Sequence, residues 1–299
     1  MRNRIITMVI VIAAVLASSP SSALAQGARP NTPAVPSVPP PPGWGNCPRC
    51  QNNADRAKAS VDYKVDGHAF NPKDLSGVWG YAGVANAFDE KTMPPLTELG
   101  KQQLEATFGE KAPDGTPLRT KDTTGEGAGK ISCDPLGWPR LHTSNYGWEF
   151  VMLPDRMLQI FETNHTWRTI WIDGRKLPEN PPEPRWLGWN AGHWEGDTFV
   201  VESNGYDDRS WIAESNPDGG WTHSDEMRVV ERYRRTSYGT LEVEITVIDP
   251  KTYTKPWVSS KATIKLVPGT ELWEHFCVPS DYANFNESVY LPAAGVKKK

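Results

Sequence analysis

The sequence predicts an all-β fold, either an antiparallel, lipocalin-like barrel or a related sandwich, with one short helix. From Trp148 onward, short apolar segments alternate with turn sequences such as Asp173-Gly174 and Tyr238-Gly239. Short connections favour antiparallel neighbours, and so many successive strands must curl into a barrel or form a sandwich to protect their edges. The chain also carries 13 Trp in 299 residues, and these large side chains are core residues first.

The N-terminus has the features of a secretory signal peptide over residues 1–25. Arg2 and Arg4 precede an apolar run, and Ala23-Leu24-Ala25 provides a cleavage site. The run is too short to span a bilayer, and no later segment is long and apolar enough. We therefore expect a periplasmic or secreted protein without a transmembrane anchor after cleavage.

A Pro-rich linker over residues 26–60 precedes a single β domain over residues 74–290. The linker contains Cys47-Pro48-Arg49-Cys50, which is compatible with a local disulfide, a redox pair or a four-cysteine zinc site; of these we expect the local disulfide. Cys133 and Cys277 lie near the two ends of the domain, and export permits a disulfide between them. The sequence thus predicts a Cys133–Cys277 bridge.

The net charge and the absence of known motifs argue against several classes of function. The formal net charge is −4, and removal of the two arginines of the signal peptide makes it about −6, which disfavours nucleic acid as a partner. The six His show no spacing typical of metal ligands, and no phosphate-binding or dinucleotide-binding glycine motif is present. We expect no metal and no cofactor.

The elements follow in order along the domain. Residues 74–80 predict the first strand. Residues 96–108 predict the helix, since Thr97 can cap its start and Gly109 can end it, although Gly100 weakens its interior. Further strands are predicted at residues 148–153, 157–162, 167–173, 189–194, 198–203, 226–236, 241–248, 258–266 and 271–277.

Alternation along these strands predicts which side chains face the core. On one strand the apolar face is formed by every second residue from Leu241 to Val247. On its neighbour it is formed by Met227, Val229 and Tyr233. Elsewhere the predicted inward faces are Leu158, Ile160 and Glu162; Arg168, Ile170 and Ile172; and Leu272, Glu274 and Phe276.

Charged residues on these faces predict a ligand site. Glu162, Arg168, Glu231 and Glu274 would converge inside the domain, where a buried charge must be paired or must line a wet cavity. A few polar groups in an apolar pocket are typical of small-molecule sites. We expect a small apolar or aromatic ligand, oriented by Glu162, Arg168 and Glu231 and enclosed by Trp171, Trp211 and Tyr233.

The loop between Ser203 and Glu226 suggests an alternative, an acid/base enzyme such as a hydrolase, isomerase or lyase acting on a small molecule. Long loops within a meander are often functional. His223 with Asp225 can form a general base and its orienting carboxylate, and Asp207 and Asp208 can supply further proton transfers.

Several motifs together resemble an uncharacterised family of exported bacterial proteins with a G-x-W-E-G-D-T motif. They are Cys133-Asp134-Pro135-Leu136-Gly137-Trp138-Pro139-Arg140, Asp173-Gly174-Arg175-Lys176-Leu177-Pro178, Gly192-His193-Trp194-Glu195-Gly196-Asp197-Thr198, His223-Ser224-Asp225-Glu226-Met227-Arg228 and Tyr253-Thr254-Lys255-Pro256-Trp257. The resemblance runs from about Asp74 to the C-terminus and implies one domain. It implies no activity and assigns no residue a role.

Overall fold

The computed structural model describes residues 67–80, 87–109, 133–144, 146–215, 219–268 and 271–272. All of them belong to one compact unit, Pro40–Lys299. The predicted signal peptide, the linker with its cysteine pair, Glu274 and Cys277 lie outside the described residues.

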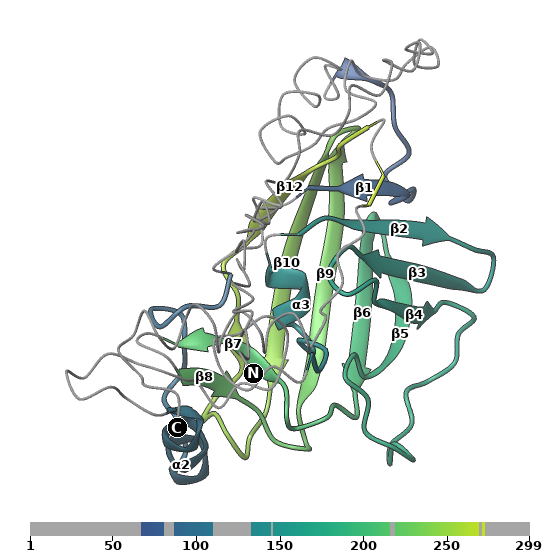
Figure 1. The fold of residues 1–299 in the computed structure, drawn as a ribbon. Helices are drawn as coiled ribbons and strands as arrows, with labels where there is room; N and C mark the ends of the chain where they lie inside the picture. The colour runs from purple at the N-terminus through teal and green to yellow at the C-terminus, as the bar shows by residue number, and fades with distance from the viewer. Residues whose placement is uncertain are drawn as a thin grey trace, which may run out of the picture. The chain divides into compact units, whose positions relative to one another are not determined.

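The described fold is mostly β, as the sequence predicts, and its main sheet curls into a half-barrel (Figure 1). Ten strands form this sheet in the order β1-β2-β3-β4-β5-β6-β9-β10-β11, with β12 also paired to β10. Their bounds are β1 Gly77–Trp79, β2 Trp148–Met152, β3 Arg156–Phe161, β4 Trp167–Trp171, β5 Trp189–Glu195, β6 Thr198–Asn204, β9 Arg228–Ser237, β10 Thr240–Ile248, β11 Trp257–Val258 and β12 Ala262–Lys265.

The two longest strands confirm the alternation argument. Met227, Val229 and Tyr233 are buried, and so are Leu241 and the alternate residues that follow it on β10. Because β9 and β10 pair in antiparallel register, these side chains form one continuous face of the core.

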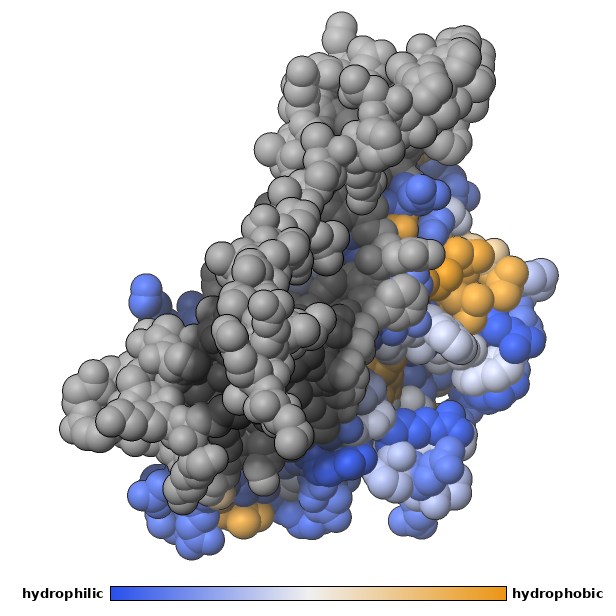
Figure 2. Space-filling view, viewed as in Figure 1, coloured by the Kyte–Doolittle hydropathy of each residue, from blue (hydrophilic) through white to orange (hydrophobic). Residues whose placement is uncertain are grey.

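The inward face predicted for β3 is wrong. Met157, Gln159 and Phe161 are buried, whereas Leu158 and Ile160 are half-buried on the outer face. Figure 2 shows the result as an apolar patch over the β2–β3 hairpin, where Leu153 is 39% exposed.

The prediction of antiparallel neighbours fails at one junction. β4 and β5 are parallel and share a single paired position, Trp171 with Ala191. The connection between them, residues 172–188, is long enough to return the chain in the same direction. We call this junction the β4–β5 seam.

Two further differences concern the second half of the chain. The strand predicted over residues 258–266 is divided into β11 and β12, because Ser259 bonds Ile245 through both its amide and its hydroxyl. The predicted loop between Ser203 and Glu226 contains a hairpin of β7 (Trp211–Ser215) and β8 (Gly219–Thr222).

Helix α2 (Glu98–Thr107) forms where it was predicted. The Thr97 hydroxyl accepts a hydrogen bond from the Gly100 amide, which caps the first turn. Gly100 has a packing role, because a Cβ there would lie 2.3 Å from the Thr252 carbonyl oxygen. Glycine weakens the interior of α2, but only a residue without a Cβ lets the helix pack this closely against Thr252.

A short helix that the sequence argument missed, α3 (Arg140–Thr143), lies against the concave face of the sheet (Figure 1). It carries His142, and Trp138 precedes it. The His142 ring lies 4.8 Å from the Trp148 ring and 5.7 Å from the Tyr233 ring. The segment therefore fills the interior of the curl with aromatic side chains.

The first and last described strands are joined by hydrogen bonds. Gly80 donates its amide to Lys265, and Val267 donates its amide to Val78. An isolated bridge links Trp79 with Leu266. Within the described part of the chain, no helix has the length and apolar character needed to cross a membrane.

Candidate functional site

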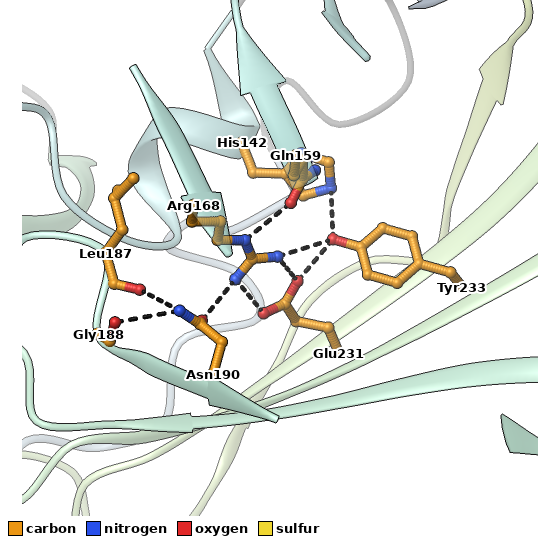
Figure 3. Close-up of polar contacts among 8 residues, drawn as sticks. All are labelled: His142, Gln159, Arg168, Leu187, Gly188, Asn190, Glu231 and Tyr233. Carbon is orange, nitrogen blue, oxygen red and sulfur yellow. Dashed lines mark hydrogen bonds and ion pairs between the residues drawn. The ribbon is translucent and has the colours of Figure 1, made fainter. Parts of the chain in front are cut away.

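A polar cluster lies inside the curled sheet, centred on Arg168 of β4 and Glu231 of β9. The two side chains form a bidentate pair, with Nη1–Oε1 at 2.8 Å and Nη2–Oε2 at 2.5 Å, and both are essentially inaccessible to solvent. Arg168 also donates Nε to Gln159 and Nη1 to Asn190 (Figure 3). Such pairing is what a buried charge requires.

Tyr233 and His142 extend this arrangement, which we call the interior cluster (Arg168, Glu231, Tyr233, His142, Gln159 and Asn190). The Tyr233 hydroxyl donates to Glu231 Oε2 at 2.5 Å and lies 3.1 Å from His142 Nε2. Since the hydroxyl has one proton, Nε2 of His142 must be the donor to Tyr233. His142 is thereby fixed as the Nε2–H tautomer, and its buried Nδ1 has no hydrogen-bond partner in the described structure.

The electrostatic environment keeps these groups in defined protonation states. Burial, with a smaller contribution from the Arg168 charge, holds the pKa of His142 well below its ordinary value of 6.5. Burial and the neighbouring Glu231 carboxylate raise the pKa of Tyr233. At neutral pH the imidazole and the phenol are therefore uncharged.

The interior cluster also holds the β4–β5 seam together. Asn190, at the start of β5, accepts from Arg168 and donates Nδ2 to the carbonyl oxygens of Leu187 and Gly188 (Figure 3). These side-chain bonds connect the two strands beside their single backbone pairing. They also fix the backbone that leads into β5.

On the other side of the seam lies an open groove with a volume of about 620 Å³. We call it the outer groove; it runs between the outer face of β4 and the connection over residues 172–188. Its lining comprises Pro135, Thr166, Trp167, Arg168, Thr169, Trp171, Arg175, Lys176, Leu177, Pro178, Pro182, Arg185, Trp186, Leu187, Gly188, Trp189, Asn190 and Ala191. Four Trp and several apolar residues dominate this surface.

Guanidinium groups stack on the Trp rings of the outer groove. The Arg175 guanidinium lies 3.5 Å from the centre of the Trp171 ring, and that of Arg185 lies 3.4 Å from the Trp189 ring. Stacked arginines hold aromatic rings in place by cation–π attraction. The groove wall is therefore partly preorganised.

The ligand-binding residues predicted from sequence are divided among several places. Arg168, Glu231 and Tyr233 meet in the interior cluster, whereas Trp171 faces the outer groove. Glu162 is buried, but Oε2 accepts from the Gly147 amide at the end of β3. Trp211 packs in the β7–β8 hairpin, where a Cβ on Gly220 would overlap its ring.

The acid/base residues predicted from sequence are also separated. His223 is buried, with Nε2 2.8 Å from Ser210 Oγ and Nδ1 donating to the Ser224 carbonyl. Burial lowers its pKa. Asp225 instead forms an exposed ion pair with Lys251.

The two remaining acidic residues of that prediction lie before β7. Asp207 forms an ion pair with Arg209, whose hydrogen bond lowers the pKa of the Asp207 carboxyl. Asp208 is exposed beside it. The structure therefore does not bring His223 and Asp225 together as a hydrogen-bonded pair.

Cysteines and metal ligands add little to the described site. Cys133 is disulfide-bonded, and since Cys277 lies outside the described residues, the Cys133–Cys277 pairing stays a prediction. Among the described residues, no group of three or more His, Cys, Asp or Glu side chains is placed to hold a metal ion.

Comparison with protein-family models, with curated proteins and with solved structures gives no match for this chain. The assignment of a function therefore rests on the geometry of the interior cluster and the outer groove.

Sequence reasoning missed most of the outer groove. One of its walls comes from residues 172–188, which the alternation argument did not cover. The available signal was compositional, since Pro, Trp, Arg and Lys are interspersed there between two strands. His142 and Asn190 were also missed, because a lone polar residue gives no sign of its distant partner.

Proposed function

We propose that this chain is an exported binding protein for a small apolar or aromatic molecule, and that the molecule lies in the outer groove. The observation that carries the proposal is the groove itself, with its volume of about 620 Å³ and a lining rich in Trp. Small-molecule sites are concave and mostly apolar, with volumes of about 300–1,000 Å³.

This proposal places the ligand outside the curled sheet, whereas the sequence suggested the inside. Arg168, Glu231 and Tyr233 bind one another in the interior, and their polar atoms are buried. The outer groove instead presents Trp167, which is 63% exposed. A ring with an open face is available for stacking on a planar ligand.

We further propose that the sheet belongs to a lipocalin-like barrel. The hydrogen bonds between β1 and the segment around β12 support this, because they connect the two ends of the strand order. The curl matters for binding, since it keeps β4 and the wall that follows it in fixed positions.

The proposal is tested by titration of the purified mature protein with 2-naphthamide, a neutral aromatic probe, followed by calorimetry and Trp fluorescence. We expect saturable binding that Trp167→Ala weakens and Leu99→Ala does not, since Leu99 is an exposed residue of α2 outside the groove. Native mass spectrometry of protein from the host envelope would identify a co-purified ligand. Absence of saturable binding, or equal binding by both variants, would refute the proposal.

One contact favours a second function, the acid/base chemistry suggested by the sequence. Ser210 Oγ and His223 Nε2 are 2.8 Å apart, which is the spacing of a nucleophile and its base. Labelling of Ser210 by a fluorophosphonate, with Ser210→Ala as the control, tests this reading. A fluorophosphonate that does not modify Ser210 in the folded protein excludes this use of the pair.

A further inference from the structure

The lining of the outer groove is one-sided in charge. Arg168, Arg175, Lys176 and Arg185 contribute to it, and the lining residues that the structure describes include no Asp or Glu. Glu179 and Glu183 belong to the same connection but do not line the groove. A carboxylate on a ligand would therefore meet cations without a facing acid.

The four cations differ in how far their charge is already neutralised. Arg168 is bound to Glu231, Arg175 to Asp173 and Arg185 to Glu183. Lys176 has no ion-pair partner among the residues that the structure describes, and it is exposed. It supplies the positive charge of the lining that no described acid offsets.

Lys176 also has a suitable neighbour. It follows Arg175, whose guanidinium carbon lies over the Trp171 ring, 3.5 Å from the ring centre. An ammonium group on a flexible stem next to a fixed aromatic surface can bind a carboxylate whose planar body contacts the Trp side chains.

We propose that the outer groove selects aromatic carboxylates, with the carboxylate bound by Lys176 and the ring system against the Trp wall. This inference rests on the proposed function and makes it specific, because it names the charge and the chemical class of the ligand. The interaction is exposed and therefore screened by salt.

The test compares 2-naphthoate with 2-naphthamide, which differ in charge but hardly in shape. At low ionic strength and pH 7.5 we expect 2-naphthoate to bind about tenfold more tightly, and the ratio of the two affinities to fall as salt is added. Lys176→Gln should bring the ratio close to one. Lys255→Gln is the control, since Lys255 is exposed and does not line the groove.

The outcomes separate the two proposals. Equal affinities for both probes, each weakened by Trp167→Ala, would overturn the inference and leave the proposed function standing. A preference for 2-naphthoate that Lys176→Gln does not reduce would overturn the assignment to Lys176. Failure of both probes to bind would refute the proposed function itself.

Discussion

The two faces of β4 differ in how the protein uses positive charge. Arg168 points into the interior, where Glu231, Gln159 and Asn190 bind its guanidinium. Trp167 and Trp171, its neighbours on the outer face, border an open groove whose arginines stack on Trp rings. The inner face of β4 thus holds a charge that is fully paired, whereas the groove beside its outer face is also lined by exposed cations.

The difference shows that a buried charge is weak evidence for a binding site. A charge inside a protein is tolerated when its hydrogen-bonding capacity is already filled, which leaves nothing for a ligand. This is why our proposal gives the interior cluster a supporting role and places the ligand in the outer groove.

The largest expected effect is on the interior side. Glu231→Gln leaves the Arg168 charge buried without its counter-ion and should reduce the free energy of unfolding by about 3–5 kcal/mol. Replacement of both partners, Arg168→Met with Glu231→Leu, should cost less than the single change. Urea unfolding at pH 7.5 measures both.

The groove provides the control for this prediction. Arg185→Met removes an exposed ion pair with Glu183 and should change stability by less than about 1 kcal/mol. If Arg185→Met reduced the free energy of unfolding as much as Glu231→Gln does, the buried and the exposed ion pair would not differ in their contribution to stability, contrary to our prediction.

A smaller loss is expected for Tyr233→Phe. The change removes the hydroxyl that donates to Glu231 and accepts from His142. Hydrogen bonds to charged groups contribute about 1.5–3 kcal/mol, and urea unfolding should show a loss in that range. Unchanged stability would mean that Arg168 alone satisfies Glu231.

Stability should also depend on pH through the buried histidines. The pKa of His142 and that of His223 are lowered from 6.5 in the folded protein, so the unfolded chain binds more protons below that pH. Their stabilising contribution is complete above pH 6.5 and is lost as the pH falls, by up to about 1.4 kcal/mol per unit for each.

The variant His142→Gln isolates one of these contributions. Unfolding free energies between pH 7.5 and 5.5 should show a shallower slope for His142→Gln than for the wild type. Leu99→Ala, which removes no titratable group and lies outside the interior cluster, should leave the slope as it is. A slope that His142→Gln does not alter would contradict a neutral, buried imidazole.

The smallest effect on stability is expected on the outer face. Trp167 adjoins Arg168 in sequence but is 63% exposed, so Trp167→Ala should change stability by no more than about 0.5 kcal/mol. Because the variant loses one aromatic ring on which the probe can stack, its affinity for 2-naphthamide should be about fivefold lower. Thermal unfolding and calorimetry on the same sample test whether Trp167→Ala lowers the affinity for the probe while leaving the stability nearly unchanged.

The sequence carried enough information to find the centre of the interior cluster. On β9 the alternation of apolar residues places Glu231 on the same face as Val229 and Tyr233, and on β4 it places Arg168 on an inward face with Ile170. A buried carboxylate requires a cation, so the pair follows from burial and charge.

The same rule failed on β3 because both faces of this strand carry apolar residues, Met157 and Phe161 on the inner face and Leu158 and Ile160 on the outer one. Leu158 and Ile160 alternate with Gln159, and burying the apolar residues is the default expectation. Gln159 instead faces inward, where its side-chain oxygen accepts from Arg168. Apolar patterning predicts the orientation of a strand only where one of its two faces is clearly the more apolar.

Other parts of the fold depend on partners distant in sequence. Nothing local in residues 172–188 specifies a parallel return to β5, and the pairing at Trp171 appears only in three dimensions. The β7–β8 hairpin did have a local signal, since Asn216-Pro217-Asp218-Gly219 is a typical turn sequence.

The β4–β5 seam also predicts where the molecule opens. With one backbone pairing between the strands, the amides on either side should exchange with solvent deuterium well before those of the β9–β10 ladder. Opening along this line would part β4 from β5 without breaking a long ladder. The outer groove lies along that same line, so the boundary of the sheet that is held by a single backbone pairing is also a wall of the groove.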